Sequence, residues 1–261
     1  MRANSVLAVL VIFTLLLFVL VHAMANDNNH IEEGCLAKAC LATGITSTGS
    51  GATTGRGSGD CSHSQAAGTI ATHSAYAEYS KGSYFMGFCL NANDTGQAIF
   101  AGAGLGKKGN SLELVLTMAD VSEFDDFLIS AKYQFLGETR SRPAVAVGID
   151  AINEIPEQMQ SSPYIVASKC LPIAKLPILA SLGWGSGRFQ DNIFGSLAFI
   201  LSRRWNFIVE YDGVGGNVGI SFASELPLGK PLPVVVILAV HNAFASDEES
   251  TLGIGAGIRF S

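Results

Sequence analysis

From about residue 83 to the end of the chain, large apolar residues alternate with small or polar ones at a period of two. In the final stretch, TLGIGAGIRFS, one face carries Leu252, Ile254 and Phe260 and the other carries Thr251 and Arg259. Successive side chains of a β-strand point to opposite sides, so this alternation predicts strands. Turn residues between the segments place twelve strands at 83–91, 96–106, 111–119, 127–136, 143–150, 163–170, 178–186, 193–201, 205–212, 216–224, 232–241 and 251–260.

A glycine-rich stretch, AIFAGAGLGKKGN at 98–110, is the one place where the sequence suggests phosphate binding. Its spacing matches neither a P-loop nor a dinucleotide-binding motif. Interpreted as a strand, it places Ile99 and Leu105 on one face and Gly102 and Gly104 on the other. The glycines are therefore expected on a crowded inner face, followed by a turn at KKGN.

The face opposite the apolar one distinguishes two kinds of all-β fold. A soluble sandwich or lipocalin-like barrel would carry many charged residues there. In this chain that face is mostly Gly, Ala and Ser, while the apolar face lacks charge and suits lipid. The pattern favours an antiparallel transmembrane β-barrel, whose candidate lumen-facing charges are Lys132, Asp150, Glu210 and Arg259. In an open pore these charges would set selectivity, and in a closed barrel they would pair.

The connections between the predicted strands alternate in charge. One set is acidic, with Asp120, Glu123, Asp125, Asp126, Asp150, Glu154, Glu157, Asp247, Glu248 and Glu249. The other set is shorter and basic, with Lys107, Lys108, Arg140, Arg142, Lys175, Arg203 and Arg204. An even number of strands places both ends of the barrel domain on the short-turn side, as in outer-membrane barrels.

Aromatic residues near the strand ends fit the same orientation. Trp205 and Phe260 lie near the short turns, and Trp184, Tyr164 and Tyr211 lie near the longer loops. Two interfacial girdles would place aromatic side chains at both of these levels.

The first 82 residues lack the alternation of the later segments and differ from them in composition. Arg2, an apolar run over 6–21 and the Ala-Met-Ala of 23–25 predict a signal peptide at 1–25, with an uncleaved anchor as the alternative. Residues 26–82 include a stretch rich in Gly, Ser and Thr and are expected to form a flexible periplasmic segment before a barrel domain at 83–261. An exported barrel of this kind would lie in the outer membrane of a bacterial cell, with lipid as its partner.

Overall composition excludes one partner class. The chain has a formal net charge of −6 and only 15% charged residues, so it lacks the basic surface that nucleic acid requires. No cofactor and no metal site are expected. Cys35 and Cys40 could close a small loop, but their spacing with Cys61 and His63 is not specific for zinc.

Enzymatic chemistry is not expected either. An outer-membrane phospholipase would need a serine beside a histidine that is held by Asn or Asp. The predicted barrel contains a single histidine, His241, without a serine in that arrangement. Acidic loops could in principle collect Ca²⁺, but they lack the ligand spacing of an EF-hand.

Several segments, among them LELVLTMADVSEFDDFLISAKYQFLGETRSRPAVAVGID and LGWGSGRFQDNIFGSLAFILSRRWNFIVEYDG, resemble the YjbH-like outer-membrane β-barrel family. The resemblance covers about 68–261 and implies an accessory role in assembly or export of a surface exopolysaccharide, with polysaccharide or export machinery as partners. The chain departs from the family at GTIATHSAY, where His73 replaces a proline. The alternative functions are a passive small-solute pore and a structural or adhesive barrel.

Overall fold

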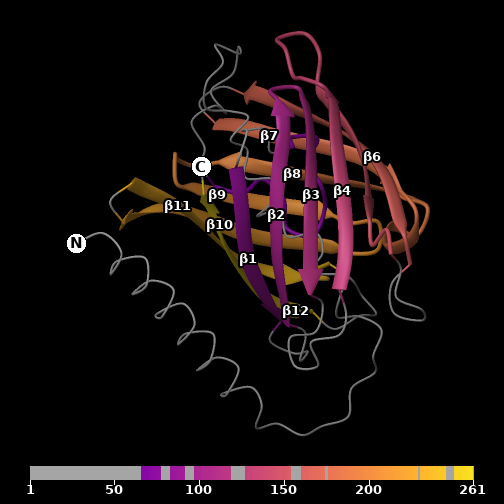
Figure 1. Ribbon diagram of the computed structural model, residues 1–261. Coiled ribbons are helices and arrows are strands. Elements are labelled where there is room, and N and C mark those ends of the chain that lie inside the picture. Colours follow the sequence, from indigo (N-terminus) through magenta and orange to yellow (C-terminus); the bar gives the residue numbers. More distant parts are fainter. Residues whose placement is uncertain are drawn as a thin grey trace, which may run out of the picture.

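The computed structural model describes residues 66–77, 83–91, 97–118, 127–153, 160–173, 176–228, 230–244 and 250–260, in which twelve strands form one closed barrel (Figure 1). Each strand pairs antiparallel with its neighbours in sequence, and β1 pairs with β12 to close the ring. The strands are β1 (Ser83–Asn91), β2 (Gln97–Lys107), β3 (Asn110–Met118), β4 (Phe127–Leu136), β5 (Ala144–Asp150), β6 (Ser162–Ile173), β7 (Leu176–Gly185), β8 (Asn192–Ile200), β9 (Trp205–Tyr211), β10 (Gly216–Leu228), β11 (Lys230–His241) and β12 (Thr251–Phe260).

The predicted fold class and all twelve predicted strands are confirmed. The largest differences in strand bounds lie at two hairpins, β6–β7 and β10–β11, whose strands run further toward their turns than expected. Pro172 pairs with Pro177, and Pro227 pairs with Pro231. A pair in which neither residue has an N–H must be a non-hydrogen-bonded pair, so these prolines leave the ladder intact.

The two faces of the barrel wall differ in burial. Large apolar side chains on the outer face are exposed, for example Leu182 at 64% and Ile193 at 57%. On the inner face glycines make room for large rings, and a Cβ at Gly102 would collide with the ring of Phe85. The glycines of 98–110 are thus inner-face strand residues, and Gly109, with a φ of 77°, completes the turn after β2.

Four of the five aromatics assigned to girdles are exposed, namely Trp184, Trp205, Tyr211 and Phe260. The assignment of Tyr164 was wrong, because its side chain is buried and faces the lumen, where it stacks against the ring of His73. Among the described residues, no helix is long and apolar enough to cross a membrane.

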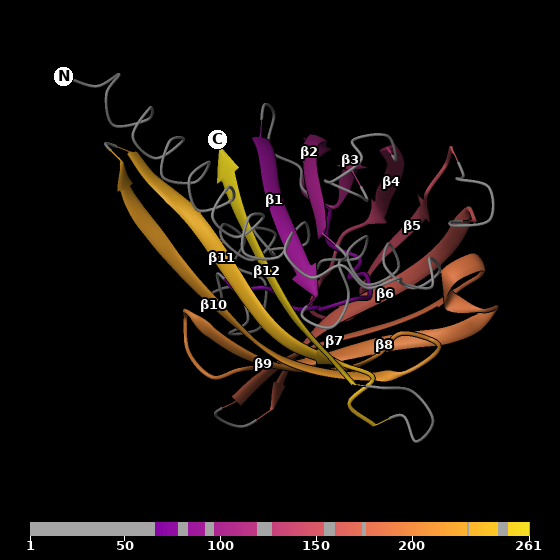
Figure 2. The ribbon, with the colours of Figure 1, turned by 90° about the horizontal axis from the view of Figure 1, so that it is seen from below.

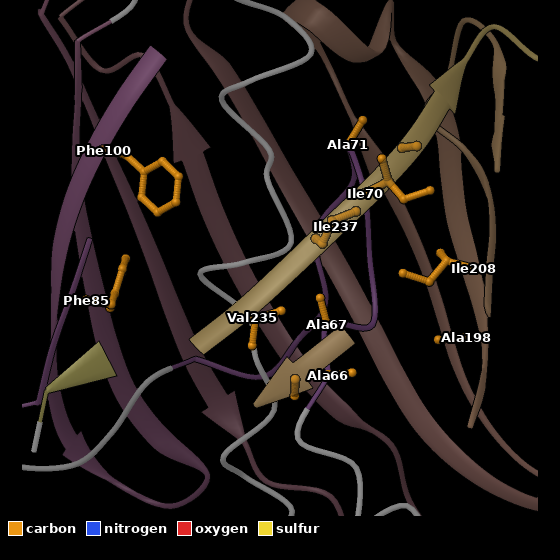
Figure 3. Close-up of a cluster of buried hydrophobic side chains, with 12 residues drawn as sticks. Ala66, Ala67, Ile70, Ala71, Phe85, Phe100, Ala198, Ile208, Val235 and Ile237 are labelled. Atoms are coloured by element: carbon orange, nitrogen blue, oxygen red, sulfur yellow. The ribbon is translucent and has the colours of Figure 1, made fainter. Parts of the chain in front are cut away.

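The core lies inside the ring of strands, and part of it comes from residues 66–77, which we call the lumen segment. Its residues are buried apart from Tyr76, which is partly so. Figure 3 shows Ala67, Ile70 and Ala71 among inner-face side chains that include Ile208 and Ile237. These residues therefore depart from the flexible periplasmic segment expected over 26–82. Residues 26–65 and 78–82 of that segment, and the signal peptide at 1–25, lie outside the described residues.

Candidate functional site in the barrel lumen

The lumen segment makes a turn inside the barrel (Figure 2). Its path can be traced from the strand residues that it contacts. Ala67 lies at the level of the paired residues Asn206 and Ser221, close to the turn at 201–204. The segment rises to Glu210, four residues further along β9, which is about 13 Å along the strand at 3.3 Å per residue. It then descends to Gln134 and Ser111, a pair beside the turn after β2. Both ends of the lumen segment thus lie at the short-turn end of the barrel.

Glu210 binds the top of this turn. Its carboxylate accepts hydrogen bonds from the backbone N–H of Ile70 at 2.9 Å, the N–H of Ala71 at 2.6 Å and the hydroxyl of Thr72 at 2.9 Å. The amide of Asn217, its partner across the β9–β10 ladder, donates a fourth at 3.3 Å. Each of these four donors is neutral, and together they solvate the buried carboxylate.

Asp150, at the end of β5, forms a second anchor with charged and ionisable partners. Its Oδ2 lies 2.8 Å from Nε2 of His73 and 2.8 Å from Nε of Arg188. Arg188 belongs to a short 3₁₀ turn, η3 (Gly187–Phe189), and also donates to the carbonyl of Ala71 at 2.9 Å. The guanidinium lies 4.0 Å from the centre of the Phe189 ring.

The ring of His73 is enclosed on several sides. It stacks on Tyr164 with centroids 4.2 Å apart and an interplanar angle of 6°, and it meets the edge of Phe189. Burial lowers the pKa of His73, and the charges of Arg188 and Lys132 act in the same direction, while Asp150 opposes them. The balance favours the neutral imidazole inside the lumen.

The descending part of the lumen segment is held by weaker, neutral contacts and by one carboxylate. The N–H of Ala75 donates to Ser168 Oγ at 2.8 Å, and that hydroxyl is 2.8 Å from the hydroxyl of Ser181. The Tyr76 hydroxyl donates to Glu138 at 2.6 Å, and burial together with that carboxylate raises the pKa of Tyr76.

The four charges expected in the lumen have different surroundings. Asp150 and Glu210 are buried and bind the lumen segment, as described above. Lys132 is also buried and lies 3.0 Å from Glu113, the residue opposite it on β3. Arg259 is half-buried on the same side of β12 as Gly255 and Gly257. The structure thus brings Asp150 and Glu210 to one segment, and it places Lys132 in a cross-strand pair.

Sequence reasoning missed the partners of these charges. Arg188 and Glu113 were not singled out, and His73 was noted only for replacing a proline. One signal was available, because GTIATHSAY is poor in charge and rich in small residues, a composition that fits a narrow polar space. The pairing itself joins residues 77 positions apart for His73 and Asp150, so no local pattern could reveal it.

Cys89 on β1 and Cys170 on β6 are both disulfide-bonded. The loop expected between Cys35 and Cys40 lies outside the described residues, as does Cys61. Among the residues that the structure describes, no cluster of three or more His, Cys, Asp or Glu side chains could hold a metal ion.

The arrangement has a clear chemical consequence. The strands supply an inner wall that is polar over much of its surface and apolar around Ile208 and Ile237. Residues 66–77 occupy the space within it through hydrogen bonds to the wall, one of them to Asp150, which is itself paired with Arg188. Since this segment is not itself a strand, it can leave without breaking any strand pairing.

No family model and no curated protein matches this chain. Membership in the YjbH-like family, and with it a role in exopolysaccharide assembly, therefore has no support from these comparisons.

Solved structures gave distant matches. A KdgM porin in complex with disordered oligogalacturonate is 9% identical, with a TM-score of 0.47, and the match covers 69% of this chain and 98% of that one. Another KdgM porin structure is 10% identical, with a TM-score of 0.45 over 69% of this chain and 98% of that one. A NanC porin is 8% identical, with a TM-score of 0.43 over 68% of this chain and 99% of that one.

Proposed function

We propose that this protein is an outer-membrane pore for small solutes, closed in the described state by its own residues 66–77. One observation carries the proposal: much of the inner wall is polar, and a segment that belongs to no strand fills part of the space within it. In a barrel without a channel, the side chains of the strands themselves fill the interior. Here the wall presents Ser168, Ser181, Ser221 and Asn206 to the interior, which suits passage of hydrated solutes.

Membrane insertion is supported by the outer face. Exposed Leu, Ile, Phe, Tyr and Trp side chains cover it, and a soluble protein would bury such a surface. Replacing Ile254, which is 42% exposed on β12, with Arg should impair insertion at a cost of about 2–4 kcal/mol near the midplane. Replacing Ser130 on the inner face with Ala is the matched control and should be tolerated. Equal tolerance at both positions would count against a membrane location.

Conductance tests the pore itself. The chain from Asn26 onward would be refolded, checked for heat-modifiable migration on a gel and inserted into planar bilayers. A companion chain would carry a Gly/Ser sequence of equal length in place of residues 66–77, which keeps all five cysteines. We expect the unaltered chain to be silent or to open briefly, and the companion to conduct steadily.

Two results would contradict the proposal. Silence of both chains after verified insertion would indicate a scaffold without a channel. Steady, equal conductance of both would mean that residues 66–77 do not close the pore. The exopolysaccharide role has no observation of its own in its favour and forms no part of the proposal.

A further inference from the structure

The barrel binds the lumen segment mainly through the segment's main chain. Asn206 donates to the carbonyls of Ala66 and Ala67 at 3.2 and 2.9 Å, and Ser221 donates to the carbonyl of Ala67 at 2.9 Å. Ser168 and Gln134 accept from the N–H groups of residues 75 and 77. Contacts to peptide groups do not depend on which side chains a ligand carries.

Ala71 shows most clearly what the wall recognises. Its N–H donates to a carboxylate oxygen of Glu210, and its carbonyl accepts from Arg188, whose guanidinium can only donate. Groups of opposite polarity therefore meet the two ends of one amino-acid unit. A sugar hydroxyl, which both donates and accepts, would need no such arrangement.

The space around this main chain is narrow. The residues of the lumen segment are mostly small, and a Cβ added at Gly68 would lie 2.6 Å from Cδ2 of Leu179. Ile70 is the largest aliphatic residue of the segment and packs in the apolar cluster with Ile208 and Ile237. The site thus combines recognition of peptide groups with a preference for small side chains.

We propose that the lumen is a binding site for short peptides that have small side chains and make a turn, and that residues 66–77 are the occupant supplied by the chain itself. The inference rests on the proposed function, since a peptide from outside can enter only when the lumen segment has left. It assigns the solute class of the pore, with Glu210, Arg188 and Asn206 as the residues that determine specificity.

The test uses the companion chain with the Gly/Ser replacement and a synthetic peptide, AAGTIATHSAYA, with capped termini. Binding of a fluorescent form of the peptide to the folded companion in detergent is measured by anisotropy, independently of conductance. We expect saturable binding, and block of conductance over the same concentration range. A peptide N-methylated at the positions of Ile70 and Ala71 lacks two N–H donors and should bind about tenfold more weakly or worse.

Glu210→Gln in the companion chain should weaken binding of the capped peptide by a similar factor. Glu225→Gln, at an exposed residue of β10, should leave that binding unchanged. If the companion fails to fold, the full chain with Thr72→Val and His73→Ala offers a weakened lumen segment that the peptide should displace. Equal binding of the N-methylated peptide, or tighter binding of a neutral oligosaccharide of similar length, would overturn the inference. Peptide binding to a companion that never conducts would support this site and contradict only the pore.

Discussion

The two buried carboxylates that hold the lumen segment do so in different ways. Glu210 accepts from four neutral donors, two of them backbone N–H groups. Asp150 is paired with the guanidinium of Arg188 and the imidazole of His73. At Glu210 every partner is a neutral dipole, whereas at Asp150 one partner is a cation. The consequences of removing each carboxylate should therefore differ.

The largest effect is expected for Asp150→Ala. It leaves the Arg188 side chain, which is 5% exposed, as a cation without its carboxylate partner. Breaking a buried ion pair on one side costs about 3–5 kcal/mol. Urea unfolding in detergent should detect a loss of this size, and Asp150→Ala combined with Arg188→Met should recover much of it. Failure of the double variant to recover stability would show that Arg188 does not act through its charge.

The second largest effect is expected for Glu210→Ala. The substitution leaves neutral donors without an acceptor, at a cost of about 1–3 kcal/mol for each donor that stays buried. The lumen segment can lower this cost by moving out of the barrel, where water accepts the hydrogen bonds. The expected readout is therefore faster amide hydrogen exchange at residues 70 and 71, with a smaller change in barrel stability than for Asp150→Ala. A loss of barrel stability greater than that of Asp150→Ala would break the contrast between the two anchors.

Acidification should weaken the Asp150 anchor. Burial lowers the pKa of His73, so the imidazole binds a proton more readily when the segment is outside the lumen. The stabilisation is full above the ordinary histidine pKa of about 6.5 and falls as the pH drops below it, by at most about 1.4 kcal/mol per pH unit. Exchange of the segment's amides should rise between pH 7 and pH 5, and His73→Gln should abolish that rise. An unchanged rise in His73→Gln would assign it to another group.

The smallest effect is expected for Thr72→Val. The substitution removes one of the four hydrogen bonds to Glu210 and keeps the volume, at a cost of about 1 kcal/mol. Amide exchange at residues 70 and 71 should be about fivefold faster than in the unaltered chain, and this ratio should not change with pH over the range used for His73. A pH-dependent response would indicate that the two anchors are coupled.

The barrel could be predicted from the sequence because its signal is local and repeated. Alternation within each segment, such as 251–260, fixes both the strand and the direction of each side chain, and the glycines of 98–110 follow from the same rule. Strands ending in prolines were predicted too short, since a proline usually marks a turn and the pairing of Pro172 with Pro177 joins two such residues.

The lumen site could be predicted only in part. Alternation places Asp150 and Glu210 on the inner face, so the two carboxylates of the lumen site were predicted from the sequence. The partners of Asp150 are His73, in a segment without alternation, and Arg188, in a turn outside the strands. Which residue meets which carboxylate depends on how the whole ring closes, and a single strand carries no information about that.

The position of the lumen segment before β1 has a consequence for how the chain folds. Its contacts join residues as far apart as Ala67 and Ser221, which are separated by 154 positions. Contacts of such high sequence separation form late, because each must first overcome the entropy of closing a long loop. The pairing of β1 with β12, which closes the barrel, also joins residues far apart in the sequence. Two orders of folding are therefore open: the barrel closes around the segment, or the segment enters the closed barrel from the short-turn end. In the first case β1 cannot reach β12 before the segment is in place, and folding would slow when the segment is replaced; in the second, folding would proceed at an unchanged rate.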